Sequence, residues 1–576
     1  MTAPESAPLA SRERALLLLL LAAFFSFGLF DHSFWGPNDS REGAMIWDML
    51  HAGRWVTPAL NGIPYLEKPP LLHWTGVILC RLAGTVHEGL LRLPAALFGF
   101  GAVLLAWRWG RLLGRERAGL AAAFLCATSF TYMEYSKIVL TDTSLAFMVM
   151  LSLSLFWNAC SSPRGRPARY ALFVLVSALA FYAKGLLGPG FVWVSVVAYL
   201  LHRRQWKLAF GLPLLFLPVF ALVLAPWAWA LWRDGGMDSL RGVFWDNQFG
   251  RFFTFSGADL PPDPYFVHKE PFYYYLLALP GMLLPWTLLV LPALVRWFRR
   301  GQGLDAPLAV FMRFALVAML LVLHASSAKV GIYAIPLLPL LFLMTAIWIE
   351  DAALRWTLRS ERWPLALTAR ALAALLFLAP FLYFLLFLLP PSLRQRHLEG
   401  VDIVRELGAP TAALTAALAL ALLAAALLFW RRLRDAFLRG DRARAFLAMP
   451  AAWAAALILA AAVFYPLYDD QRTPRPFAEL LRAEQARGRR IVLAVSEEKY
   501  IGDFTFYTRQ RLPVADFSPD LRSLLERSPS PIGAVVKTSA LEKHGAAWGL
   551  DAFPALQSPH PGYAANKFRL LIHDPP

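Results

Sequence analysis

The sequence predicts an all-α, polytopic membrane protein that ends in a small α/β domain. Of its 576 residues 58% are hydrophobic and only 16% are charged, and the mean hydropathy of +0.49 is above the range of ordinary soluble domains. Apolar runs recur along residues 1–466, whereas residues 467–576 are mixed and charged. The net charge of +17 comes from Arg residues in short clusters between apolar runs, a pattern typical of membrane topology and not of nucleic-acid binding.

Thirteen segments approach the roughly 17–25 apolar residues that a transmembrane helix needs. They are residues 15–30, 93–109, 118–133, 143–159, 170–183, 186–201, 208–232, 272–295, 307–323, 330–349, 371–389, 411–430 and 450–465. Together they predict a transmembrane domain over residues 1–466.

The basic clusters predict which way each span points, because cytoplasmic loops carry excess Lys and Arg. One alternating path places every cluster on the cytoplasmic side, provided that residues 71–84 form a juxtamembrane or re-entrant helix and do not cross. The same path places the juxtamembrane loops 31–92 and 233–271 on the outer side. The clusters are those at Arg12, Arg108, Arg164, Arg203, Arg296, Arg355 and Arg431.

The C-terminal residues 467–576 fall on the outer side and predict a soluble α/β domain. Short β-like runs at 491–495 and 533–536 alternate with helix-like stretches at 476–487 and 519–527. The three cysteines lie within apolar stretches without metal-like spacing, so neither a disulfide framework nor a zinc site of cysteines is indicated.

The first outer loop contains the polar residues that suggest chemistry. Asp39 and Arg41 lie near its start, and Glu67 and Lys68 stand directly before Pro69-Pro70, where the chain turns back into apolar sequence. Such charges are often merely solvated. Ionisable groups at membrane depth are costly, however, and carboxylates beside cations can take a proton from an acceptor while the cations hold a phosphate. We therefore favour a function for them.

Two further outer segments carry candidate residues whose roles stay open on the sequence alone. Asp142 stands at the start of a span and would serve either as a helix cap or as a catalytic carboxylate. His268, in the loop that also holds Arg251, would be a metal ligand, a base or an interfacial histidine. The tyrosines that follow it fit an aromatic belt at the membrane surface.

Five motifs in register on the outer side resemble the aminoarabinose lipid A transferases, which belong with the protein O-mannosyltransferases among the GT-C glycosyltransferases. The similarity runs in order through residues 10–350. The motifs are Glu67-Lys68-Pro69-Pro70-Leu71-Leu72-His73-Trp74, Leu140-Thr141-Asp142, Lys184-Gly185 with Pro189, His268-Lys269-Glu270-Pro271-Phe272-Tyr273-Tyr274, and Lys329 with Tyr333, Pro336 and Pro339.

The resemblance implies an enzyme of the bacterial inner membrane with a periplasmic active site, an undecaprenyl-phosphate-linked sugar donor and inversion at the anomeric carbon. The acceptor would be lipid A, a protein or another glycan. By position, Lys68 and Arg41 would hold the donor phosphate, and Asp142 would be a catalytic carboxylate. Lys184, Lys329 and Arg251 are further candidates for binding the donor phosphate. Glu67 and His268 match the pair that can hold a divalent metal (Zn²⁺, Mg²⁺ or Mn²⁺) in relatives.

The chain departs from this family at one position. The family usually has an acidic pair three and two residues before the Arg, whereas this chain has Asn38 and Asp39 before Arg41. The first carboxylate, often assigned as the base, is absent. Either Asp39 substitutes from the next position or Asp142 suffices.

A transporter or flippase for a lipid-linked glycan is the alternative function. It would lead us to expect repeated halves and ionisable residues near the middle of the spans. The acidic residues instead cluster at one face of the membrane, which favours the transferase.

Overall fold

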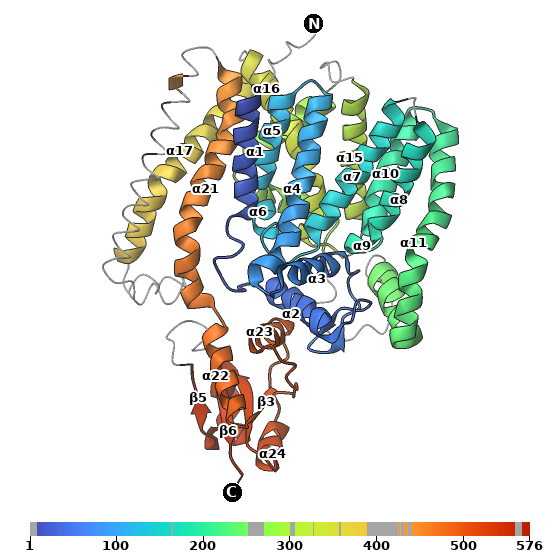
Figure 1. Ribbon diagram of the computed structural model, residues 1–576. Helices are drawn as coiled ribbons and strands as arrows, with labels where there is room; N and C mark the ends of the chain where they lie inside the picture. Colours follow the sequence, from blue (N-terminus) through green and yellow to red (C-terminus); the bar gives the residue numbers. More distant parts are fainter. Residues whose placement is uncertain are drawn as a thin grey trace.

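A computed structural model describes residues 9–162, 165–250, 270–299, 306–326, 328–355, 359–388, 441–558 and 567–575, with a few single residues between 424 and 435. These residues are mostly helical. Figure 1 shows a bundle of long helices above, with a smaller unit below that contains the C-terminus. Six of the described helices are long and apolar enough to cross a membrane: Glu88–Leu112, Asp142–Ser161, Trp206–Gly250, Pro307–Ala325, Gly331–Leu354 and Arg442–Ala462.

The helices of the bundle follow the order of the predicted spans. They are α1 (Ser11–Ser26), α4 (Glu88–Leu112), α5 (Glu116–Ala127), α6 (Phe130–Tyr135), α7 (Asp142–Ser161), α8 (Arg166–Leu179), α9 (Phe181–Lys184), α10 (Leu187–His202), α11 (Trp206–Leu240), η1 (Arg241–Gly250), α13 (Tyr274–Met282), α14 (Thr287–Phe298), α15 (Pro307–Ala325), η2 (Gly331–Leu337), α16 (Leu338–Arg355), α17 (Arg359–Leu388) and α21 (Arg442–Arg472). The count of thirteen spans is not confirmed, and most of the predicted span 411–430 lies outside the described residues.

The predicted span 272–295 differs from the structure, which divides it into α13 and α14. Pro285 lies in the break between them. Because proline has no backbone N–H and its ring crowds the preceding turn, it ends a helix that apolar sequence alone would continue.

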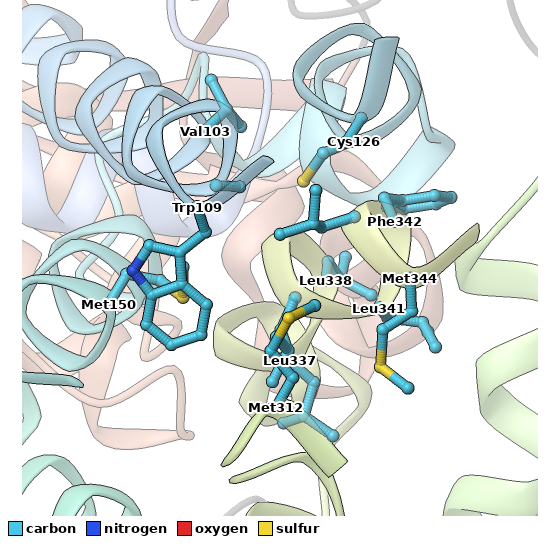
Figure 2. Packing of buried hydrophobic residues seen from close by; sticks show 14 of the residues in the cluster. Val103, Trp109, Cys126, Met150, Met312, Leu337, Leu338, Leu341, Phe342 and Met344 are labelled. Carbon is cyan, nitrogen blue, oxygen red and sulfur yellow. The ribbon is translucent and has the colours of Figure 1, made fainter. Parts of the chain in front are cut away.

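The core of the bundle lies between α4, α5, α7 and α16, and Figure 2 shows its buried side chains. Helices α4 and α5 approach so closely that a Cβ on Gly110 would lie 2.5 Å from the Cα of Gly119. The buried Trp109 indole donates a hydrogen bond of 2.8 Å to the hydroxyl of Ser154 on α7. This packing fixes the position of α7, and therefore the position of Asp142, its first residue.

Residues 31–92, which the sequence predicts as the first outer loop, are folded, although the sequence predicts only a loop there apart from residues 71–84. It forms α2 (Pro37–Ala52), a short antiparallel hairpin of β1 (Ala59–Leu60) and β2 (Ile63–Pro64), and α3 (Leu71–Ala83). Figure 1 shows α2 and α3 lying across the lower end of the bundle.

Residues 475–558 and 567–573 form a four-stranded sheet flanked by helices, with strand order β3-β4-β6-β5. Strands β3 (Arg490–Leu493) and β4 (Ile532–Lys537) are parallel, and β6 (Phe568–His573) runs antiparallel to β4 and to β5 (Ala555–Leu556). The helices are α22 (Arg475–Ala486), α23 (Glu498–Thr508), α24 (Asp520–Glu526), α25 (Thr538–Trp548) and the short η3 (Leu550–Ala552). We call this the C-terminal region; its independence as a domain stays a prediction, and the predicted boundary at 466–467 falls inside α21.

Helix α23 packs directly on α2, so that the C-terminal region covers the first outer loop. A Cβ on Gly502 would lie 2.7 Å from the carbonyl oxygen of Ser40, which shows that the two backbones touch. The Ser40 hydroxyl donates to the carboxylate of Asp503. Further bonds across the contact join Tyr507 to Phe34, Lys499 to Trp35, Arg511 to Asp48 and Asn61 to Leu512.

The buried carboxyl of Asp503 predicts that this contact depends on pH. Burial raises the pKa of Asp503 to about 7, against the opposing effects of Lys499 and the Ser40 hydroxyl. Because the pKa in the docked state lies above its ordinary value of 3.8, the stabilising effect is fully present below about pH 4 and is lost as the pH rises through 7. We expect the protection of α23 amides against hydrogen exchange to be higher at pH 5.5 than at pH 8.

The variant Asp503→Asn cannot titrate and serves as the control. Its α23 amides should show the same protection at both pH values, after correction for the intrinsic exchange rate. Equal protection at both pH values in the unmodified protein would contradict the assignment to Asp503.

Candidate active site

Helix α2 carries the first group of candidate residues on neighbouring turns. Pro37 begins the helix, which suits a residue with a fixed φ and no N–H to donate. Residues three and four apart lie on the same side of a helix, so Asn38 and Arg41 are neighbours. The Arg41 Nη2 donates to the side-chain oxygen of Asn38 at 3.1 Å. The residue that departs from the family pattern therefore helps to orient the arginine.

A buried carboxylate, Glu42, collects three partners, and we call these four residues the Glu42 cluster. Its Oε1 accepts from Lys68 Nζ at 2.6 Å and from Arg41 Nη2 at 3.1 Å. Its Oε2 accepts from His73 Nε2 at 2.8 Å. Glu42 and His73 are fully buried, whereas 13% of the Lys68 side chain and 17% of the Arg41 side chain remain exposed. The two cations are thus the parts of the cluster that a ligand can reach.

The charges of the Glu42 cluster depend on one another. Burial alone would raise the pKa of Glu42, but Lys68, the hydrogen bond from His73 and the charge of Arg41 hold it well below its ordinary value. Burial lowers the pKa of Lys68, while Glu42 opposes that effect. A carboxylate that stays ionised keeps the two cations in place, where each can also pair with a further anion.

Asp39, predicted as one of two possible bases, lies in a buried ion pair. Its Oδ2 accepts from Arg92 at 2.8 and 3.1 Å, and its Oδ1 accepts from the backbone N–H of Val139 at 2.6 Å. Both carboxylate oxygens therefore already have donors. In this arrangement Asp39 joins α2 to α4 and to the segment before α7.

Asp142, the other predicted base, is fully buried. One of its carboxylate oxygens has a hydrogen-bond partner and the other has none in the described ranges. Its Oδ1 accepts from the ammonium of Lys184, which lies 4.3 Å from the centre of the Tyr333 ring. Its Oδ2 has no hydrogen-bond partner among the residues that the structure describes. Lys184 thus fixes the orientation of the carboxylate, and Oδ2 is the atom available to accept a proton.

The turn after Lys184 requires glycine. Gly185 has φ +68° and ψ −149°, a combination that is essentially restricted to glycine, and an added Cβ would lie 1.9 Å from Gln248 Oε1. The same oxygen accepts from the backbone N–H of Leu186 at 2.9 Å. The neighbouring Asn247 donates to the Leu66 carbonyl at 3.3 Å. The segment η1 therefore connects the Lys184 turn with the Glu67-Lys68 segment.

The structure says less about the roles of the remaining predicted site residues. Lys329 donates to the carbonyl oxygens of Ser326 at 2.5 Å and of Glu270 at 3.4 Å. Glu67 is partly buried beside Lys68. Arg251 and His268 lie outside the described residues, and within the described part of the chain no three His, Cys, Asp or Glu side chains converge as a metal site.

The sequence gives no role to Glu42 or His73, although both stand in the segments that it singles out. Two sequence features could have drawn attention to them: Glu42 is a carboxylate directly after Arg41, and His73 is a histidine in a mostly apolar helix. The meeting of α2 with α3, which brings the two together, is a tertiary contact that no local pattern contains.

Gly185→Ala tests the importance of the Lys184 turn. We expect a lower melting temperature and a loss of activity. Alanine at this position would be strained by the positive φ and would also clash with Gln248. Backbone strain of this kind costs about 1–3 kcal/mol of folding free energy. Thermal unfolding of the purified protein measures the effect. Gly190→Ala, in α10 with open space around its Cβ position, is the matched control and should be neutral or slightly stabilising. Equal melting temperatures for both variants would contradict the role of the turn.

Comparisons with known proteins show what this chain is similar to. Residues 67–232 match the family model of dolichyl-phosphate-mannose-protein mannosyltransferases. The chain is 32% identical over 336 residues to the undecaprenyl phosphate-alpha-4-amino-4-deoxy-L-arabinose arabinosyl transferase of Pseudomonas aeruginosa PAO1, and 26% identical over 337 residues to that of Edwardsiella ictaluri. These matches cover 57% and 58% of this chain and 58% and 59% of the two relatives.

The fold resembles that of a solved structure over almost the whole chain. ArnT from Cupriavidus metallidurans, bound to undecaprenyl phosphate, superposes with a TM-score of 0.70 over 98% of both chains at 18% sequence identity. The chain therefore has the fold of this transferase, and within that fold residues 67–232 match the dolichyl-phosphate-mannose-protein mannosyltransferase family.

Proposed function

We propose that this protein transfers a sugar from a polyprenyl-phosphate-linked donor to an acceptor at the outer face of the membrane. The observation that carries the proposal is the Glu42 cluster, in which Lys68 and Arg41 are held over one buried carboxylate. Similarity to arabinosyl transferases that use undecaprenyl phosphate, and to an ArnT structure that contains this lipid, supports the same donor class.

The donor phosphate would bind to the cations of the Glu42 cluster. Lys68 supplies a compact point charge, and the guanidinium of Arg41 supplies a planar pair of donors. As the bond between the anomeric carbon and the phosphate oxygen breaks, the lipid phosphate gains negative charge. Cations already in place stabilise this charge more in the transition state than in the bound donor.

The acceptor would attack the anomeric carbon from the opposite side, with inversion. Its hydroxyl or amine loses a proton as the new bond forms, and Asp142 Oδ2 is the proposed recipient of that proton. Lys184 keeps the carboxylate oriented during the step. Asp39, with both oxygens engaged, would act as a structural residue and not as the base.

The other parts of the proposal concern location and partners. We place the protein in a bacterial inner membrane with about thirteen spans, and its active site and C-terminal region in the periplasm. The acceptor would be lipid A, another envelope glycan or a protein. If a divalent metal takes part, its ligands would be Glu67 and His268, whose carboxylate oxygen and imidazole nitrogen suit Zn²⁺ or Mn²⁺.

Removing either cation of the cluster should weaken donor binding. Charge-assisted hydrogen bonds are worth about 1.5–3 kcal/mol, so we expect Lys68→Ala and Arg41→Ala to raise the dissociation constant for undecaprenyl phosphate by roughly 10–100-fold. Binding to the purified protein in lipid nanodiscs measures this. Arg54→Ala removes an exposed cation of the same outer segment and should bind normally. Unchanged affinity in both cluster variants, with intact folding, would place the phosphate elsewhere.

Replacing Asp142 by Asn should separate catalysis from binding. The change keeps the size of the side chain but removes the base, so we expect kcat to fall by roughly 10²–10⁴ while donor affinity stays the same. Turnover with a purified lipid-linked sugar measures it. Asp39→Asn should instead lower the melting temperature, because it weakens the buried pair with Arg92.

The result for Asp142→Asn also reports on the acceptor. A phosphate acceptor is already ionised at neutral pH and needs little help from a base. Near-normal turnover in this variant would therefore eliminate base catalysis by Asp142 and leave stabilisation of the departing lipid phosphate as the main source of rate.

A further inference from the structure

The first residue of α23, Glu498 in the C-terminal region, reaches Arg41 of the Glu42 cluster. Arg41 Nη1 donates to Glu498 Oε2 at 2.8 Å. We infer that Glu498 occupies the position of the donor phosphate at Arg41 and is displaced when the donor binds. This inference rests on the proposed function, and it adds a residue of the C-terminal region that tunes donor affinity.

Arg41 is held in place without Glu498. Its Nη2 donates to Glu42 and to Asn38, both at 3.1 Å. Its guanidinium lies 5.3 Å from the centre of the Tyr65 ring, at the distance of a cation–π contact. Nη1, bonded to Glu498, is thus the nitrogen whose partner can change while the arginine keeps its position.

The two carboxylates at Arg41 differ in how firmly they are bound. Glu42 is fully buried and also pairs with Lys68, so removing it from the cluster would leave a buried lysine short of its counter-charge. Glu498 is 42% exposed. An ion pair with such an exposed partner contributes only about 0–1 kcal/mol, because water and salt screen it and the carboxylate is readily hydrated once released. Glu498 is therefore the partner that a phosphate can displace.

The charge balance favours an exchange of one anion for another. Arg41 pairs with the two carboxylates of Glu42 and Glu498, and Lys68 pairs with Glu42. A sugar linked to a lipid through a phosphodiester carries one negative charge. Replacing Glu498 by the donor phosphate keeps the same balance and gives Arg41 an oxygen acceptor at the same nitrogen.

The exchange also connects donor binding to the C-terminal region. Glu498 starts the helix that packs on Ser40 through Gly502, so its release changes the first turn of α23 while the rest of the helix stays in contact with α2. The neighbouring Glu497 pairs with Lys537 and not with Arg41, which makes it a natural comparison residue.

The test is the affinity of the full-length protein for undecaprenyl phosphate in nanodiscs. We expect Glu498→Gln to lower the dissociation constant by up to about 5-fold, the equivalent of an exposed ion pair. Glu497→Gln should bind like the unmodified protein. In an Arg41→Gln background the effect of Glu498→Gln should disappear, since the competition acts through that guanidinium. The gain in affinity should also shrink at high salt.

The outcomes separate this inference from the function on which it rests. If Lys68→Ala weakens binding but Glu498→Gln leaves it unchanged or weakens it, the displacement is wrong and the proposed donor site stands. A gain in affinity that persists in the Arg41→Gln background would also overturn the displacement, because it would reflect general electrostatics. If neither Lys68 nor Arg41 affects binding of undecaprenyl phosphate, both proposals fail.

Discussion

The buried pair of Arg92 and Asp39 is the interaction on which the end of the bundle that carries α2 depends. Arg92 donates to Asp39 and to the carbonyl oxygens of Leu29, His32 and Ser33, at distances of 2.7–3.2 Å. Asp39 in turn accepts from the amide of Val139. One guanidinium thus ties together the chain after α1, the start of α2, α4 and the segment before α7. Removing a partner from a buried charge of this kind is strongly destabilising, so the contacts of Arg92 hold these elements together.

This constraint explains how two chemically different centres are assembled from distant segments. The Glu42 cluster lies between α2 and α3, and the Asp142–Lys184 pair lies between α7 and α9. The ring contact of Trp74 with Tyr182 joins α3 to α9 near both centres. We interpret the first as the place where charge develops on a leaving phosphate and the second as the place where a proton is removed. Because the two centres lie on separate helices, the carboxylate of Asp142 pairs with Lys184 and does not neutralise Arg41 or Lys68.

The sequence predicts much of this, for physical reasons that can be traced to particular residues. Apolar length locates the helices of the bundle, and the sequence singles out Lys184-Gly185, where the structure has a turn that only glycine allows. It does not predict Glu42 as the centre of a cluster, because Arg41 and Lys68 meet only after α2 and α3 pack. The sequence analysis also misses α23, because the aromatic and β-branched residues in Tyr500–Thr508 lack a clear helical period. The contact with α2 supplies the stability that the helix propensity of these residues does not.

The contact between Ser40 and Asp503 joins residues that are 463 positions apart in the chain. At the usual rate of about 5–20 residues per second, a ribosome needs roughly 20–90 s to make the intervening chain. During that interval the polar groups of α2 and the backbone around Ser40 are uncovered, because the helix that packs on them has not yet been made. The contact between α2 and α23 therefore forms only after nearly all of the chain has been synthesised. A chain whose translation stops early has α2 and α3 but lacks the helix that covers them.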